Sequence, residues 1–297
     1  MPISSIILTE NNINQQPNTF DASINSAPYN KLFLPIQNGA NLKNSQISIQ
    51  KINMYFSFPN ITSSNYQAAT VQWLVGGSYS SFSWNLTQNY NYATISQLND
   101  ALQAFCISNG LYLINGSSNV YYLTLVANPN SYGVDLTLFK VPTSLPVGYT
   151  QPANFAGYPT ISSTPRITFK SAFNRIIGYT AGTLYDGVTT QTSYTSQFCP
   201  QLSPTSAILV ACNIAFNPLA LNGSSSVMNV FTTKDTAFGS MLVVEPQELV
   251  WYDINASSAS QLIVEFYNQD YQPLNLLDPQ ITVQLLIRDK PASSLIV

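Results

Sequence analysis

Strict alternation of apolar and polar residues through the last third of the chain constrains the fold more than any other sequence feature. In Ile281–Arg288 every second residue, counted from the first, is aliphatic, and Gln261–Tyr267 and Ala207–Phe216 repeat this period of two. Such a period is typical of a strand with one buried face. Two further strands are expected at Val227–Thr232 and Met241–Tyr252. Because no segment of Ser206–Lys290 has helical spacing, the region predicts five strands of an antiparallel β-sandwich.

The first 61 residues predict three more strands. A short apolar run, Ile6–Leu8, lies in a polar stretch, and we interpret residues 1–30 as an extended arm with one edge strand. Tyr29–Ile36 is the next strand, and Gln46–Phe58 is the strongest. The alternation of Gln46–Phe58 changes phase at Gln50-Lys51, which predicts a β-bulge that redirects the strand without ending it.

The middle of the chain has a different pattern. A hairpin is expected around Gly76-Gly77, and a capping box at Thr94–Gln97 predicts an amphipathic helix that ends near Asn109-Gly110. The remaining strands are expected at Val120–Val126, Gly133–Val141, Arg166–Phe169 and Ile176–Tyr179. Five prolines between residues 142 and 165 predict a surface loop, and the polar stretch Asp186–Ser203 is interpreted as a linker.

Three strands before residue 61 and five after residue 205 give eight, the number in a jelly roll. We therefore predict a mainly β fold: a single jelly-roll antiparallel sandwich with an inserted, mostly β domain that carries one amphipathic helix. The expected parts are residues 1–61 (arm and first strands), 62–203 (inserted, outward-facing domain) and 204–297 (remaining strands). Insertion is tolerated where the two ends of an exposed loop lie close together.

Charged residues are scarce. They make up 8% of the chain, against about 25% in typical soluble proteins. Because charge is depleted at interface cores, a neutral polar surface favours a protein that is assembled against neighbours. An extracellular β-protein with an uncharged surface is the alternative. The net charge of −3 argues against a nucleic-acid partner. The closest basic group, Arg166, Lys170 and Arg175, is interpreted as a solvated face.

The chain has no histidine, which excludes Ser-His-Asp and Cys-His catalysis and removes the commonest transition-metal ligand. Its cysteines, Cys106, Cys199 and Cys212, lack the C-x-x-C spacing of a zinc site and are odd in number. Asp253 and Glu265 lie on neighbouring predicted strands and could form the carboxylate pair of a glycosidase. Because 13 acidic residues produce such pairs by chance, we predict no enzyme, no catalytic or metal-binding residue and no cofactor.

The N-terminus lacks the charged and apolar regions of a signal peptide, and no apolar run reaches the roughly 18 residues of a membrane span. We therefore expect no membrane span and synthesis in a reducing cytoplasm.

Two groups of short motifs carry a resemblance to a known family. The first comprises Asn128–Tyr132 (NPNSY), Val141–Pro146 (VPTSLP), Thr164–Ile167 (TPRI) and Arg175–Gly182 (RIIGYTAG). The second comprises Ile208–Asn213 (ILVACN), Phe238-Gly239, Pro246–Trp251 (PQELVW) and Asp278–Asp289 (DPQITVQLLIRD). Over about residues 45–290 the chain resembles the minor capsid, or penton, proteins of virophages and Polinton-like double-stranded DNA viruses, mavirus-type virophages in particular. One departure is Tyr185-Asp186, where the family pattern has Tyr-Pro.

The resemblance implies a structural protein of the virion. It would be made and assembled in the host cytoplasm, form a homopentamer at each vertex of an icosahedral capsid and contact the major capsid protein. The family has no catalytic residues that the resemblance would assign to positions of this chain. The alternative is a carbohydrate- or receptor-binding β-domain, in which aromatic residues of the inserted domain would stack on a host glycan. The candidates are Trp73, Tyr79, Trp84, Tyr90 and Tyr92, although such rings also serve as core.

Overall fold

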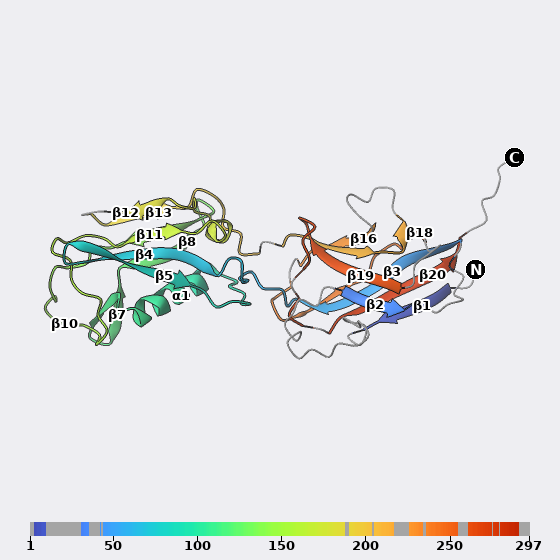
Figure 1. Cartoon of the computed structure of the whole chain (residues 1–297), viewed down its shortest axis with the longest axis horizontal. Coiled ribbons are helices and arrows are strands. Elements are labelled where there is room, and N and C mark those ends of the chain that lie inside the picture. The colour runs from blue at the N-terminus through green and yellow to red at the C-terminus, as the bar shows by residue number, and fades with distance from the viewer. Residues whose placement is uncertain are drawn as a thin grey trace. The chain divides into compact units, whose positions relative to one another are not determined.

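The chain divides into two compact units, which are described separately. Residues 1–59 and 205–297 form the first, here the sandwich unit, and residues 60–204 form the second, here the insert unit. The computed structural model describes residues 3–9, 31–35, 42, 44–187, 190–203, 205–216, 226–233, 236–254, 261–274, 276–278 and 280–290. Both units consist mainly of antiparallel strands, as predicted (Figure 1).

Two antiparallel sheets form the sandwich unit. The first contains β1 (Ile3–Leu8), β3 (Ser45–Tyr55), β15 (Ala215–Phe216), β17 (Met241–Val244), β18 (Tyr252–Ile254) and β20 (Thr282–Asp289). The second contains β2 (Lys31–Pro35), β14 (Ile208–Cys212), β16 (Ser226–Phe231) and β19 (Gln261–Asn268). Inward-facing aliphatic side chains of both sheets, such as Ile52, Val210 and Val283, share one buried core.

Strand pairing in the sandwich unit is nested, with early strands against late ones. β1 pairs with β20, β2 with β19, β3 with β17 and β18, and β14 with β16. Two further ladders, β20 with β3 and β19 with β14, complete the two sheets. This wrapping of one long hairpin into two sheets is the jelly roll. As predicted, β1 is an edge strand. The rest of the predicted arm lies outside the described residues.

The predicted bulge in β3 is confirmed. Opposite β3, Gln284 pairs with Lys51 and Leu285 pairs with Ile49, so Gln50 is the extra residue of the ladder. Gln50 is exposed, whereas Ile49 and Ile52 on either side of the bulge are both buried. The bulge therefore keeps both halves of this long strand facing the same core.

The insert unit contains three small sheets. One contains β4 (Gln67–Val75), β5 (Ser78–Asn85), β11 (Arg166–Phe169) and β12 (Leu184–Asp186). The second contains β8 (Leu123–Asn128), β9 (Gly133–Leu138) and β13 (Thr192–Thr195). The third contains β6 (Tyr112–Asn115), β7 (Ser118–Tyr121) and β10 (Tyr149–Thr150). The predicted hairpin is β4–β5, and it turns at Gly76, whose φ of 58° suits glycine.

Helix α1 (Ile95–Ser108) begins at the predicted capping box. The backbone N–H of Gln97 donates to Thr94 Oγ1 at 3.2 Å, and the Gln97 side chain accepts from the N–H of Ala93 at 2.7 Å. The apolar face of the helix buries Leu98 and Leu102 in the core of the insert unit. The helix therefore covers the sheets of its own unit, as its sequence pattern predicts.

Six predicted elements differ in the structure. Ile176–Tyr179 is not a strand, because α2 (Asn174–Ile177) occupies it and ends at Gly178, which has a φ of 80°. The predicted linker contains β13, a polar edge strand that pairs with β9. Val120–Val126 is divided at Tyr122 between β7 and β8, which belong to different sheets. Met241–Tyr252 is divided between β17 and β18 by a segment that contains Pro246, which cannot donate to a ladder.

Ala207–Phe216 is divided between β14 and β15, which lie in opposite sheets, and the predicted proline-rich loop contains the short strand β10. With the division of Met241–Tyr252, the sandwich unit therefore has ten described strands where eight were predicted.

The side chain of Asn60, which is buried, forms hydrogen bonds that link the two ends of the insert unit. The Asn60 amide donates to the carbonyl oxygens of Tyr92 at 2.8 Å and Leu202 at 2.6 Å, and its oxygen accepts from the N–H of Tyr92 at 2.9 Å. Asn60 and Leu202 are 142 residues apart in the sequence, yet the Asn60 side chain forms a hydrogen bond directly with Leu202. Asn60 thus closes the insert unit at its base.

A second buried polar group, the Tyr179 hydroxyl, links strands of the insert unit. It accepts from the N–H of Leu136 at 2.8 Å and lies 2.6 Å and 2.5 Å from the carbonyl oxygens of Val134 and Tyr194, to which it can donate. Burial raises the pKa of this phenol, which keeps it protonated as a donor.

Replacing Tyr179 with Phe is expected to destabilise the insert unit by about 1–3 kcal/mol, because the N–H of Leu136 is left buried without its acceptor. Denaturant unfolding of the full chain measures this change. Tyr132→Phe is the matched control, since Tyr132 is 79% exposed, and a change within about 0.5 kcal/mol is expected there. Equal stability of Tyr179→Phe and the parent chain would contradict the role assigned to the hydroxyl.

Candidate functional site

The tryptophans proposed as a sugar-stacking platform are core residues. Trp73 and Trp84 are fully buried, and Tyr92 is almost so. The Trp73 Nε1–H donates to the carbonyl oxygen of Gly157 at 2.9 Å, and Trp84 lies edge-to-face against Phe173 with ring centroids 5.9 Å apart. These three rings cannot stack on a ligand, and the interpretation of them as core is confirmed.

The remaining two residues considered for sugar stacking, Tyr79 and Tyr90, do not form a binding platform either. The Tyr90 ring is exposed but tilted against Tyr92, 4.7 Å between centroids. The Tyr79 ring is covered by the guanidinium of Arg166, 3.9 Å from its centroid. Arg166 also pairs with Asp186 at 3.2 Å, so it is not part of a solvated basic face as predicted, whereas Lys170 and Arg175 are exposed.

The carboxylates considered for a glycosidase do not form a pair. Asp253 lies on β18 and Glu265 on β19, and the jelly roll places these consecutive strands in opposite sheets. Asp253 contacts the Lys290 ammonium at 2.6 Å, which together with a hydrogen bond from Gln46 lowers the pKa of its carboxyl. Glu265 contacts Lys31 at 2.7 Å. Each carboxylate therefore has its own cation, and the two do not form the pair that was considered for a glycosidase.

The three cysteines are free thiols. Cys106 on α1 and Cys212 on β14 are buried, whereas Cys199 is exposed. Burial raises the pKa of the Cys106 thiol to about 12 and that of Cys212 to about 11, so both stay protonated near neutral pH. Within the part of the chain that the structure describes, no group of three or more Cys, Asp or Glu side chains is placed to hold a metal ion. No helix in that part is long and apolar enough to cross a membrane.

One outer surface of the sandwich unit is unusually apolar. We define the β14 face as Leu209, Ala211, Val230, Ile263 and Tyr267, which lie on the side of sheet β16-β14-β19-β2 opposite the core. The register supports this, because Leu209 is opposite both Val230 and Tyr267. The outer face of a sandwich sheet is commonly polar, yet both faces of β14 are apolar and buried. Val230 at its margin is 54% exposed.

Charge on the β14 face is confined to a neutral pair. Lys31 and Glu265 lie opposite each other on β2 and β19 and form the 2.7 Å ion pair described above. Burial, and after it the nearby Glu265 carboxylate, raises the pKa of Tyr267 to about 12. Leu209, Ala211 and Glu265 are buried within the single chain, so the most accessible part of the β14 face is its margin at Val230.

The second candidate surface lies at an edge of the other sheet. We define the β17 edge as Phe238, Met241, Val243, Leu249 and Val250, all exposed hydrophobic residues in or beside β17. Met241 and Val243 are opposite Tyr55 and Asn53 of β3 and are about half exposed. β3 is the only described strand that pairs with β17, so the other side of β17 is a sheet edge. Exposed apolar edges of this kind favour contact with other chains.

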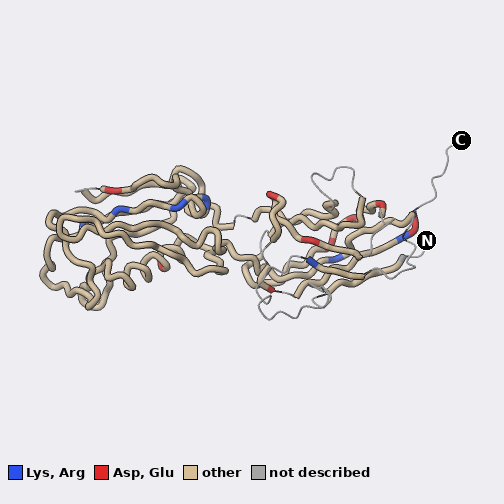
Figure 2. The backbone as a smooth tube through the Cα atoms, in the orientation of Figure 1, with Lys and Arg blue, Asp and Glu red and all other residues tan. Residues whose placement is uncertain are grey.

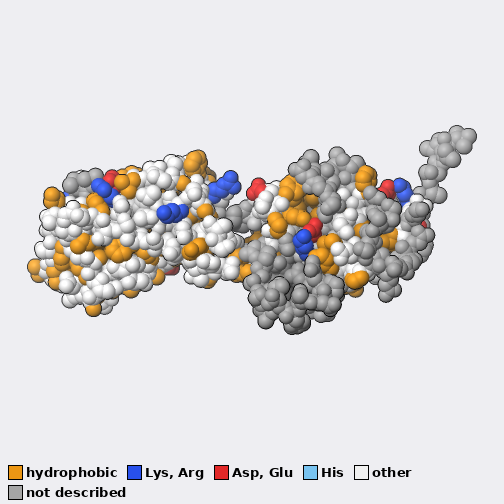
Figure 3. Space-filling model, viewed as in Figure 1, with side chains coloured by type: hydrophobic (Ala, Val, Ile, Leu, Met, Phe, Trp, Pro, Cys, Tyr) orange, Lys and Arg blue, Asp and Glu red, His pale blue; other side chains and the backbone are white. Residues whose placement is uncertain are grey.

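Charge beside the β17 edge comes from one cation and two acidic residues. Lys51 of β3 pairs with Glu245, the residue after β17, at 2.6 Å, and the exposed Glu248 precedes Leu249. Figure 2 shows how widely the charged residues are spaced along the chain, and Figure 3 shows a surface made mostly of hydrophobic and neutral groups. Sequence reasoning predicted an uncharged surface but not these two patches, because they depend on register and on the division of β17 from β18.

Comparisons with known proteins find similarity at the level of structure and not of sequence. No protein-family model matches this chain, and no curated protein matches it. Among solved structures, the chain is similar to the selenomethionine-labelled mavirus penton protein, with a TM-score of 0.42 and 12% sequence identity. The alignment covers 97% of this chain and 98% of that chain. At 12% identity, residue roles do not transfer from one chain to the other.

Proposed function

We propose that this chain is a structural protein of an icosahedral viral capsid, in which five copies form the vertex and contact the surrounding major capsid protein. Jelly rolls build viral capsids, but they also build lectins and other proteins. Because one fold serves several functions, the proposal depends on surfaces of this chain and not on the fold alone.

The observation that carries the proposal is the presence of two different exposed apolar regions on the sandwich unit. Copies arranged in a closed ring contact each other head to tail, so each copy needs two different, complementary surfaces. The β17 edge is exposed, and Val230 marks an exposed margin of the β14 face; we assign these two regions to the two sides of the subunit interface. The ion pairs beside them, Lys31 with Glu265 and Lys51 with Glu245, are neutral, which limits the unpaired charge buried when copies meet.

The low charge of the whole chain and the family motifs of its sequence are consistent with the same role. The insert unit lies in the connection between β3 and β14, and we propose that it faces outward from the virion while the sandwich unit occupies the capsid wall. Assembly would then take place in the host cytoplasm before the vertex is closed.

Co-expression with the major capsid protein of the same virus tests the proposal. We expect shells in which density for this chain fills the five-fold vertices, and we expect the isolated chain or its complex to give a mass near five times 32.6 kDa. Shells with empty vertices and none of this chain would exclude the penton role.

Replacing both Met241 and Val243 with Glu is expected to weaken vertex assembly by about 100-fold or more. An uncompensated charge in a buried contact costs about 3 kcal/mol or more, and each 1.4 kcal/mol is a factor of ten. Native mass spectrometry at several concentrations measures the change. The control is Val147→Glu, the same chemical change at a fully exposed position of the insert unit. Equal assembly of the double variant and the control would show that the β17 edge is not an interface.

A further inference from the structure

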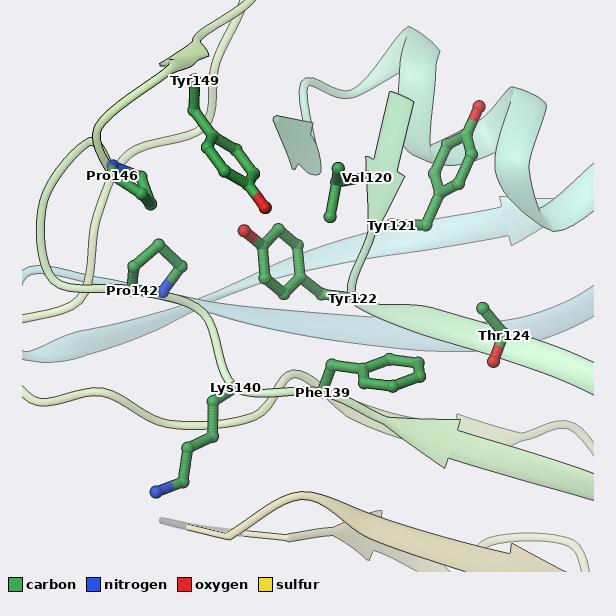
Figure 4. Close-up of a pocket in the computed structure, with 9 residues that line it drawn as sticks. All are labelled: Val120, Tyr121, Tyr122, Thr124, Phe139, Lys140, Pro142, Pro146 and Tyr149. Carbon is green, nitrogen blue, oxygen red and sulfur yellow. The ribbon is translucent and has the colours of Figure 1, made fainter. Parts of the chain in front are cut away.

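The insert unit contains an open pocket lined mainly by aromatic and other apolar residues. Its volume is about 520 Å³, within the usual range for small-molecule sites. The lining residues come from the β7–β8 junction and from the segment between β9 and β10: Val120, Tyr121, Tyr122, Thr124, Phe139, Lys140, Pro142, Pro146 and Tyr149 (Figure 4). None of the aromatic residues considered from the sequence for glycan binding is among them.

Two phenolic hydroxyls in this pocket lack protein partners. Figure 4 shows the oxygens of Tyr122 and Tyr149 pointing toward one another from opposite walls. Tyr122 is only 6% exposed, yet no described residue forms a hydrogen bond with its hydroxyl or with that of Tyr149. Neither oxygen is sealed from solvent, so both hydroxyls are open to the pocket and can bond to a ligand.

The hydroxyl of Tyr122 remains both a donor and an acceptor under ordinary conditions. Burial raises the pKa of Tyr122 to about 12, and the neighbouring phenols of Tyr149 and Tyr158 add to this shift. A neutral phenol can donate one hydrogen bond and accept others, which matches the hydroxyl groups of a sugar.

The walls of the pocket are held in place before any ligand binds. The Tyr122 ring lies edge-to-face against the buried Trp73, 5.7 Å between centroids, and the Tyr122 carbonyl accepts from the N–H of Phe139 at 2.9 Å. On the opposite wall, the N–H of Tyr149 donates to Pro146 at 3.1 Å, and the two prolines restrict the backbone. Rigid aromatic walls reduce the entropy lost on binding.

The only charged group in the lining is a cation. Lys140 is exposed, no acidic residue lines the pocket, and no described carboxylate pairs with the Lys140 ammonium. In Figure 4 its side chain extends from the pocket wall away from the two phenols. A ligand held between the phenols could therefore reach Lys140 only with a substituent at its outer end.

We propose that this pocket binds a terminal sugar that carries a carboxylate, as in an acidic oligosaccharide. The sugar ring would lie against the aromatic walls, its hydroxyls would bond to Tyr122 and Tyr149, and its carboxylate would face Lys140. A proline-rich peptide also suits aromatic grooves, but proline has no backbone N–H to donate to the phenol oxygens. This inference goes beyond the capsid role, which requires no sugar.

Calorimetric titration of the full chain with sialyllactose and with lactose tests the proposal, because the second probe lacks the acidic sugar. We expect sialyllactose to bind at least about tenfold more tightly than lactose. Lys140→Gln should remove this preference, and Tyr149→Phe should weaken sialyllactose binding about tenfold. The controls are Lys170→Gln and Tyr132→Phe, which alter exposed groups outside the pocket lining and should bind as the parent does.

Three results would overturn the proposal: no binding of sialyllactose, equal binding of both sugars, or binding unchanged by Lys140→Gln and Tyr149→Phe. Tyr149-dependent binding of a polyproline peptide in place of the sugar would also overturn it. Melting temperatures of the variants verify that they fold. Vertex assembly is measured in a separate experiment. A negative sugar titration would therefore leave the capsid proposal intact, and a negative assembly experiment would leave the sugar-binding proposal intact.

Discussion

Removing residues 60–204 and joining Pro59 to Thr205 through a short polar loop is expected to leave a folded β-sandwich. All ten strands of the two sandwich sheets lie outside the deleted segment, and their core includes no residue of the insert unit. Removing residues 1–59 instead takes away β1, β2 and β3. Since β3 pairs with β20, β17 and β18, the second deletion would remove the central strand of the first sheet of the sandwich unit.

Far-ultraviolet circular dichroism and thermal unfolding distinguish the two deletions. The first variant should keep a β-type spectrum and a cooperative transition, because most single domains unfold in one step. The second should have neither. A first variant without folded β signal would contradict the assignment of the sandwich unit as an independently folding domain.

Replacing Trp73 with Ala is expected to destabilise the insert unit by about 3–5 kcal/mol. The side chain is fully buried between β4 and Tyr122, and its Nε1–H bond to Gly157 would also be lost. Chemical unfolding of the full chain should show the loss in the transition of the insert unit, with that of the sandwich unit unchanged.

The control for Trp73→Ala is Val147→Ala, which shortens a fully exposed side chain of the same unit and should change stability by less than about 0.5 kcal/mol. If Trp73→Ala left the insert unit as stable as this control, the interpretation of Trp73 as a core residue would be wrong.

Sequence reasoning succeeded where one local pattern determines one element. Alternation locates β19 and β20, the change of phase locates the bulge at Gln50, and Thr94 with Gln97 locates the start of α1. It failed for β13, whose residues are polar on both faces because it is a short edge strand. It also failed for α2, where Ile176 and Ile177 suggested a strand and Gly178 was not recognised as a helix end.

The candidate sites depend on contacts that no local pattern reports. Tyr122 and Tyr149 meet only because the chain changes sheets at Tyr122 and returns after the prolines. The β14 face follows from register between strands distant in sequence, although the continuous apolar run of Ile208–Cys212 already indicates burial on both faces. The separation of Asp253 from Glu265 is likewise a property of the jelly-roll wrapping.

The closure of the insert unit by Asn60 has a consequence for the order of folding. To the sandwich unit, the connection from β3 to β14 is a loop of about 150 residues, and the entropy lost on closing a flexible loop grows with its length. Once the insert unit has folded and Asn60 has joined Leu202, the two attachment points are already neighbours. The pairing of β3 with β17, β18 and β20 then no longer requires closure of the loop that the unfolded insert would form. Folding of the insert unit first is therefore the faster route to the complete chain.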